Sequence, residues 1–286
     1  MSSPAPTRPS TAHSSGRTPE GREAARILKE AIDAADAVVL GAGAGLSAAA
    51  GLTYDGPRFR SLFADLIERY GLSDMYSAGF HPFPTPQERW AYWSRHVMAN
   101  CYDQPDLPLY RHLLGLLEAT EFFVVTTNAD TAFLRNGLPP ERLFAVQGSY
   151  ARFQCSRPCR QETWDNEASI RAMAAHQSDA RIPSGLLPQC PWCGAPAAMN
   201  LRIDSTFVQD ASWDRSCRRY QDFLDRHGNE RVLYLEIGVG WNTPGIIKLD
   251  FWRRVHANPR ATYLLVNPDS TVPAEIRDRT IILDGL

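Results

Sequence analysis

Four cysteines are the clearest group of residues with metal chemistry in this sequence. Three residues separate Cys155 from Cys159, two separate Cys190 from Cys193, and about 30 lie between the pairs. Each short spacing turns two thiolates to one side, so that the pairs together can complete the tetrahedral coordination of zinc. Four thiolates leave no position for water, so the pattern predicts a structural zinc site. Four unrelated buried cysteines are the alternative.

A glycine-rich turn offers phosphate chemistry. It follows the apolar run 37–40 and contains Gly43, Gly45 and Ser47. Glycine lets a backbone approach a phosphate closely, and a helix start beyond it offers free N–H groups. The turn matches a dinucleotide fingerprint, but no strand ending in an acidic residue follows about 20 residues on. We therefore expect a nucleotide site that is not of the ordinary hydride-transfer type; a plain strand-to-helix connection is the alternative.

Polar or glycine residues also follow the later predicted strands. Strands are expected over 121–126, 143–146, 232–237, 263–266 and 281–283, with helices over 213–227 and 243–256 between them. This alternation predicts an α/β fold, a Rossmann-like parallel sheet with helices on both faces. Ligands of such sheets bind at the carboxyl ends of the strands. One crevice is therefore expected to collect the residues that follow those ends, namely Asn128, Asp130, Gln147, Gly238, Gly240 and Asn267.

The remaining stretches define the domain organisation. Residues 1–20 are rich in Ser, Pro and Thr and are expected to form a disordered tail. The Rossmann-like domain is predicted over 21–149 and 200–286, interrupted by a small zinc-binding module at 150–199. Helices predicted within 53–118 are expected to form a lid over the nucleotide.

Composition narrows the class of partner. The formal net charge of -2 gives no global attraction to nucleic acid or to an anionic membrane. No apolar run reaches the roughly 20 residues of a membrane helix. Six cysteines, four of them in metal-type pairs, favour a reducing compartment, so a cytoplasmic location is expected. Organelle targeting by the tail is the alternative.

The order of these motifs resembles that of the sirtuin family. Residues 43–52 are similar to its Gly-Ala-Gly-Ile-Ser-x-x-x-Gly-Ile signature, and residues 127–130 to its Gln-Asn-Ile-Asp segment. Residues 147–149 stand where sirtuins have His-Gly-Ser, and residues 201–204 resemble Leu-Arg-Pro-Asp. Gly238-Val239-Gly240 stands for the Gly-Thr-Ser loop, and Asn267 for the Asn after the next strand. The resemblance covers about residues 22–286 and implies the sirtuin (DHS-like NAD-binding) fold.

Departures from the deacylase pattern point to one branch of that family. The catalytic His position is Gln147, and the glycine loop continues to Tyr54 instead of Pro-Asp-Phe-Arg. These features, with Leu235–Gly238 and Thr243-Pro244, resemble the class M, macrodomain-linked sirtuins. That resemblance implies NAD+-dependent mono-ADP-ribosylation of a protein, with a lipoyl-carrier, glycine-cleavage H-like acceptor. It also implies a macrodomain ADP-ribosyl hydrolase as a possible partner.

The resemblance further implies roles for individual residues. Gly43, Ala44, Gly45 and Ser47 would bind the pyrophosphate, with Gly51 and Tyr54 beside the same NAD+ site. Asn128 would bind the ribose, and Asp130 would face the nicotinamide. The adenosine half would be held by Gly238, Val239, Gly240 and Asn267.

Gln147 and Arg202 bear on the reaction itself. A neutral amide is no base near pH 7, whereas a carboxylate acceptor is already ionised and needs none. Gln147 would then hold a ribose hydroxyl or the acceptor, and a degenerate, inactive site is the alternative. Arg202 would orient an acceptor carboxylate or a ribose hydroxyl; a salt bridge with Asp204 or another sheet carboxylate is its alternative.

Two other functions stay open on the sequence. One is an NAD+-dependent deacylase (deacetylase) or NAD+ hydrolase, and the other is a non-catalytic NAD+ or ADP-ribose sensor. Asn128 and Asp130 argue against the sensor, because binding alone does not require residues on the nicotinamide side.

Overall fold

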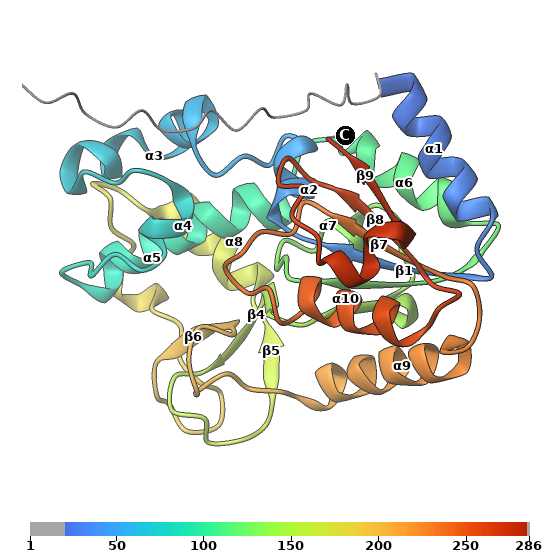
Figure 1. Ribbon diagram of the computed structural model, residues 1–286. Coiled ribbons are helices and arrows are strands. Elements are labelled where there is room, and N and C mark those ends of the chain that lie inside the picture. The colour runs from blue at the N-terminus through green and yellow to red at the C-terminus, as the bar shows by residue number, and fades with distance from the viewer. Residues whose placement is uncertain (1–20, 285–286) are drawn as a thin grey trace, which may run out of the picture.

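A six-stranded parallel sheet forms the centre of the molecule. The computed structural model describes residues 21–284, and the tail predicted over 1–20 lies outside the described residues. The strand order is β3-β2-β1-β7-β8-β9 (Figure 1). The strands are β1 (Ala37–Ala42), β2 (Glu121–Thr126), β3 (Leu143–Ala145), β7 (Val232–Ile237), β8 (Thr262–Val266) and β9 (Thr280–Leu283). All pair in parallel, as the near-continuous apolar runs predicted.

The strand order places the ligand crevice. The chain leaves β1 toward β2 and β3 on one side, and later adds β7, β8 and β9 on the other. The direction of winding therefore reverses between β1 and β7, which are paired from Ala37 with Val232 to Ala42 with Ile237. Open α/β sheets bind ligands at such a switch point, outside the carboxyl ends of the strands.

Helices cover both faces of this sheet (Figure 1). α1 (Gly21–Asp33) and α6 (Pro108–Leu117) pack on one face through residues such as Ile32, Tyr110 and Leu113. α9 (Ala211–His227) and α10 (Lys248–Ala257) cover the other through Tyr220, Phe223 and Phe251. The short helices α2 (Ala44–Ala49) and α7 (Ala132–Arg135) follow β1 and β2. Within residues 21–284, no helix combines the length and hydrophobicity needed to cross a bilayer.

The helical block and the cysteine module share one core. α3 (Gly56–Tyr70), α4 (Met75–Ala78), α5 (Pro86–Val97) and the π-helix η1 (Met98–Tyr102) lie beside α8 (Glu167–His176) and an antiparallel sheet. That sheet has the order β5-β4-β6, from β4 (Gly148–Cys155), β5 (Thr163–Asp165) and β6 (Ala197–Leu201). Phe63 and Tyr92 belong to the same apolar cluster as Phe153 and Ile170. The segment predicted as a lid is thus packed against the predicted zinc module.

One predicted boundary is wrong. The helix expected over 243–256 begins at Lys248, and residues 243–247 form turns instead. Ile246 N–H donates to Thr243 O at 3.2 Å, and the Thr243 hydroxyl accepts a hydrogen bond from Gln147. Pro244 and Gly245 suit such a turn. Because it is not helical, the segment 243–247 places Thr243 within hydrogen-bonding distance of Gln147, which follows β3.

The four cysteines of the module meet at one point. Cys155 ends β4, and the sulfur atoms of Cys155, Cys159, Cys190 and Cys193 all lie within 4.8 Å of one another. Cys155 Sγ lies 3.7 Å from Cys193 Sγ, and Cys159 Sγ lies 3.6 Å from Cys190 Sγ. Four sulfurs at about 2.3 Å around a tetrahedral zinc are about 3.8 Å apart. The cluster confirms the predicted structural zinc site.

A buried ion pair joins the sheet to α10. Lys248 and Glu236 are 1% and 0% exposed, and Lys248 Nζ donates to Glu236 Oε1. The other carboxylate oxygen accepts from Tyr263 OH at 2.6 Å. Burial raises the pKa of Glu236, and the hydrogen bonds from Lys248 and Tyr263 oppose that rise. Both charges depend on each other, because neither reaches water.

We predict that Cys190→Ser weakens zinc binding and lowers the melting temperature by at least about 5 °C. The zinc then no longer links the two loops, and each kcal/mol shifts the melting temperature by roughly 2–4 °C in a chain of this size. Metal analysis and calorimetry test this, with Cys217→Ser, outside the cluster, as the control. Equal zinc content and stability in both variants would contradict a structural site.

We predict that Lys248→Met lowers the free energy of unfolding by about 3–5 kcal/mol, because it leaves a carboxylate buried without its counterion. The double variant Lys248→Met/Glu236→Leu should lose less, since no uncompensated charge remains. Urea unfolding of both variants makes the comparison. A double variant as unstable as the single one would show that packing, and not the stranded charge, sets the cost.

Candidate functional site

A close contact between two loops forms the floor of the candidate site. Gly45 N–H donates to Gly238 O at 2.9 Å, joining the start of α2 to the loop after β7. A Cβ on Gly43 would lie 2.5 Å from Gly238 O, and one on Gly45 would lie 2.7 Å from Gly238 Cα. These glycines therefore let two backbones touch. The sequence predicts that Gly45 binds the pyrophosphate. Its N–H already donates to Gly238 O, so a phosphate oxygen would have to share that donor with the carbonyl.

The Ser47 hydroxyl is the centre of a buried polar network. It donates to Asp130 Oδ2 at 2.5 Å, accepts from Asn128 Nδ2 at 3.0 Å and lies 2.8 Å from Tyr110 OH. A serine hydroxyl has one proton, and Ser47 uses it in the hydrogen bond to Asp130. Tyr110 OH is therefore the donor in its hydrogen bond with Ser47. Asn128 Nδ2 also donates to Gly43 O at 2.9 Å. Ser47 thus fixes the two polar residues that follow β2.

Asp130 is held in a nearly dry position. It is 5% exposed, and its second oxygen, Oδ1, accepts from Ala132 N–H at 2.9 Å. Burial raises the pKa of this carboxyl, while the Ser47 and Ala132 hydrogen bonds act in the opposite direction. The next residue, Thr131, has φ of 62°, a left-handed conformation that costs energy outside glycine. This loop and the two hydrogen bonds hold the Asp130 carboxylate in a single orientation.

Tyr54 pairs with a tyrosine of the small sheet. Gly51, with φ of 102°, turns the chain after α2, and Tyr54 OH then lies 2.8 Å from Tyr150 OH. Burial, with the nearby Tyr150 and Asp130, raises the pKa of Tyr54, so both phenols stay neutral. Arg58 supports this segment by donating to Thr53 O at 2.9 Å and to Asn100 Oδ1 at 2.9 Å.

A buried histidine lies behind the tyrosine pair. Its ring contacts those of Tyr54 and Tyr150 edge-on, at 5.4 and 4.8 Å between centroids. Burial and the Arg58 charge lower the pKa of His96 to about 3. With 1% of its surface exposed, His96 is a packing residue and not a substitute base.

Gln147 is linked to the loop after β7. Its Nε2 donates to Thr243 Oγ1 at 3.0 Å, although β3 and β7 are separated by two strands. Its backbone oxygen accepts from Arg202 N–H at 3.1 Å, where the chain leaves the small module. Gln147 therefore stands where the sheet, the module exit and the β7 loop meet.

Arg202 has an exposed side chain that lines a hollow beside Val146 and Gly245. The alternative ion pair with Asp204 does not form; Asp204 Oδ1 accepts instead from Thr206 N–H at 2.7 Å and from Thr206 Oγ1 at 2.6 Å. Within the described residues, no salt bridge involves Arg202.

The far end of the crevice is formed by the loops after β7 and β8. Asn267 Nδ2 donates to Val239 O at 2.8 Å, and Gly238 N–H donates to Val266 O at 3.0 Å. A Cβ on Gly240 would meet no atom within 4 Å, so the loop is open there. Trp241 follows with 48% of its surface exposed and its indole Nε1 bonded to Asp269.

Three contributing residues were not predicted from the sequence to belong to the site. Tyr110, Tyr150 and Thr243 reach the site from α6, from β4 and from a stretch predicted as helix. Tyr110 and Tyr150 carry no spacing signal, since their partners lie 63 and 96 residues away. Thr243 carried a weaker signal, as part of a Thr-Pro pair.

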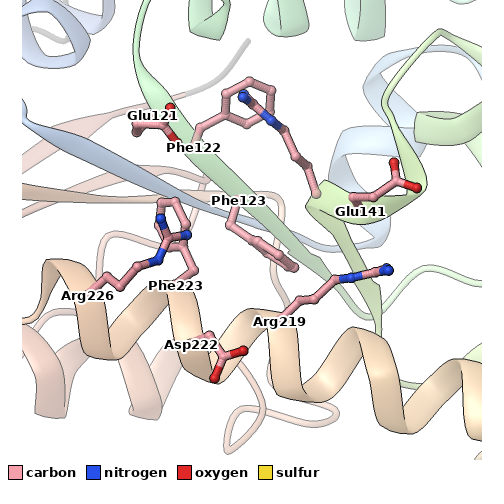
Figure 2. Close-up of a pocket in the computed structure, with 9 residues that line it drawn as sticks. Glu121, Phe122, Phe123, Glu141, Arg219, Asp222, Phe223 and Arg226 are labelled. Atoms are coloured by element: carbon pink, nitrogen blue, oxygen red, sulfur yellow. The ribbon is translucent and has the colours of Figure 1, made fainter.

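A second hollow of about 430 Å³ lies away from this site (Figure 2). It includes Glu121, the first residue of β2, and therefore lies at the amino end of that strand. Arg219, Asp222 and Arg226 of α9 line it together with Phe122 and Phe123. The polar crevice lies at the carboxyl ends of the strands, so this hollow lies at the opposite edge of the sheet.

Relatives of known name resemble the chain over nearly its whole length. It is 41% identical over 266 residues to a protein ADP-ribosyltransferase of Staphylococcus aureus, covering 92% of this chain and 84% of that protein. It is 33% identical over 276 residues to a probable bifunctional ADP-ribose hydrolase/ADP-ribosyltransferase of Fusarium oxysporum, covering 91% of this chain and 45% of that protein. No family model matches the chain.

Solved structures share the fold. A Sir2 enzyme structure superposes with a TM-score of 0.54 at 17% identity, covering 91% of each chain. A Sir2 homologue in complex with 2′-O-acetyl-ADP-ribose gives a TM-score of 0.55 at 19% identity, covering 91% of this chain and 90% of that one. The chain therefore has the Sir2 fold and belongs to the family of protein ADP-ribosyltransferases.

Proposed function

We propose that the protein transfers one ADP-ribosyl group from NAD+ to a carboxylate of a lipoyl-carrier, glycine-cleavage H-like protein. The observation that carries the proposal is an intact Asn128–Ser47–Asp130 network beside a glutamine where a deacylase has its base. NAD+ supplies the activated ribose and a neutral nicotinamide leaving group. The C1′–nitrogen bond breaks with its electron pair going to nicotinamide, and an acceptor carboxylate oxygen forms the new bond to C1′.

The strand ends fit an extended dinucleotide. The residues that follow β3, β2, β1, β7 and β8 line up in that order across the sheet, over about four strand spacings or roughly 19 Å. Asn128 and Asp130 would hold the ribose and nicotinamide, with Tyr54 beside them. The start of α2 from Gly43 to Ser47 would hold the pyrophosphate. Gly238, Val239, Gly240 and Asn267 would hold the adenosine half.

Ser47 has a different task in this proposal from direct phosphate binding. Its hydroxyl already has three protein partners, so it positions Asn128 and Asp130. Asn128 keeps acceptor capacity on its side-chain oxygen for a ribose hydroxyl. The network is thereby set before the substrate arrives, and pre-set polar groups are the main source of transition-state stabilisation.

Gln147 separates transfer from deacylation. A deacylase requires proton removal from a ribose hydroxyl, and neither Gln147 nor the buried, neutral His96 can accept that proton. An ionised carboxylate acceptor attacks without a base. Gln147 and Thr243 together would hold the acceptor or the ribose, and Arg202 would orient the acceptor.

The partners follow from the same proposal. The resemblance to class M sirtuins supports a lipoyl-carrier acceptor and a macrodomain ADP-ribosyl hydrolase that reverses the modification. The Fusarium relative is itself named as a probable bifunctional ADP-ribose hydrolase/ADP-ribosyltransferase, which supports that pairing. Four cysteine thiolates suit a reducing compartment, which supports a cytoplasmic location.

We predict that Asn128→Ala lowers transfer of labelled ADP-ribose from NAD+ to the lipoyl-carrier protein by about 100-fold or more. The reason is the loss of a positioned amide at the reacting ribose. Gel autoradiography measures the adduct. The control is Asn229→Ala, an exposed asparagine just before β7 and remote from the crevice. Equal activity in both variants would remove Asn128 from the mechanism.

We predict that the wild-type protein does not transfer the acetyl group of an acetyl-lysine peptide to ADP-ribose when NAD+ is supplied, because Gln147 cannot remove the ribose-hydroxyl proton that this reaction requires. Mass spectrometry of the products, with the lipoyl-carrier reaction run in parallel, distinguishes the activities. Efficient formation of O-acetyl-ADP-ribose would establish a deacylase instead. Binding of NAD+ with no nicotinamide release under either condition would favour the sensor.

A further inference from the structure

A groove with a volume of about 390 Å³ lies between α9, α10 and the end of β3; it is the hollow that Arg202 lines. Its inner wall is apolar, from Val125, Phe144 and Val146 of the sheet side and Tyr220 of α9. Its outer wall comes from the turns before α10 and from the exit of the small module, at Gly245 and Arg202. The volume lies within the range of ligand-binding pockets, about 300–1,000 Å³.

The charges around this groove are unbalanced. Arg202, Arg253 and Arg254 line it together with a single carboxylate, Asp250. That carboxylate is already paired with two of these arginines, because Oδ1 accepts from Arg253 and Oδ2 accepts from Arg254 Nε at 2.7 Å. Three positive charges and one negative charge leave a local net charge of +2 on a protein whose overall charge is -2.

The groove adjoins the reacting end of the crevice. Val146 precedes Gln147 in the chain, and Arg202 N–H donates to Gln147 O at 3.1 Å. On the other side, Gly245 lies two residues after Thr243, whose hydroxyl accepts from Gln147 Nε2 at 3.0 Å. A chain segment seated in the groove would therefore extend directly to Gln147.

We propose that this groove is a docking surface for an acidic segment of the protein acceptor, next to the modified side chain. Local positive charge selects carboxylate-rich segments and accelerates their encounter. The sheet-side wall gives an apolar contact between the charges. The partner's identity as acceptor rests on the proposed function; the acidic character of what binds rests on the groove alone.

The binding test uses a fluorescent oligoglutamate peptide and anisotropy at low and physiological salt. Wild-type protein should bind it, and more weakly at high salt because the contacts are partly exposed. Arg253→Glu should weaken binding by about fivefold or more, the effect of about 1 kcal/mol of surface charge interaction. Arg253→Gln should lose less. The Arg253 side chain is 74% exposed, so neither change disturbs the core.

The matched control is Arg226→Glu, which makes the same charge change on α9 at the other hollow (Figure 2). It should bind the peptide within about twofold of wild type. Equal weakening in both variants, or no binding by wild type, would overturn the proposal. Tighter binding of an oligothymidylate of equal charge would overturn it in favour of nucleic acid.

A kinetic arm separates this inference from the proposed function. With the lipoyl-carrier protein as acceptor, Arg253→Glu should raise KM for that protein about fivefold and leave KM for NAD+ unchanged. An unchanged KM for the carrier protein would count against the groove. Absence of transfer by wild type would defeat the proposed function, while the peptide measurement would still decide the docking surface.

Discussion

The contact between the loop after β1 and the loop after β7 is the constraint on which the site depends. Gly45 donates to Gly238 at 2.9 Å, and no side chain fits at either position. This contact closes the switch point of the sheet and fixes the start of α2. Ser47 is buried two residues later, and its hydroxyl fixes the positions of Asn128 and Asp130. A larger residue at the contact would therefore disturb the polar network as well as the loops.

The polar network and the neutral residues around it together define the electrostatic character of the candidate site. Asp130 is kept in a nearly dry position by two hydrogen bonds, and the surrounding phenols and His96 stay uncharged. Gln147 bonds to Thr243, and the histidine side chains that form hydrogen bonds within the described residues bond to other partners. Such a site suits an acceptor that is already ionised. It fits the membership of the chain in the group of protein ADP-ribosyltransferases.

The small module has a wider role than a zinc-stabilised insertion. Its sheet and α8 share an apolar core with α3, α5 and η1, so the metal and this core stabilise the same body. Two hydrogen bonds connect the module to the crevice. Tyr150 OH pairs with Tyr54 OH, and Arg202 N–H donates to the backbone oxygen of Gln147. The module thus contributes both to the tyrosine pair and to the position of Gln147.

The sequence by itself determined the parallel sheet, the helices on both faces and the four-cysteine cluster. These depend on local signals: apolar runs, helical periodicity and short cysteine spacings. It also indicated the strand ends that carry Asn128, Asp130 and Gln147. Only the tertiary structure decided what these side chains bond to. The partners of Ser47, Tyr54 and Gln147 lie 63 to 96 residues away, and their pairing depends on packing between elements and not on spacing. For the same reason, the basic groove beside Gln147 became visible only when α10 and the exit of the module were placed side by side.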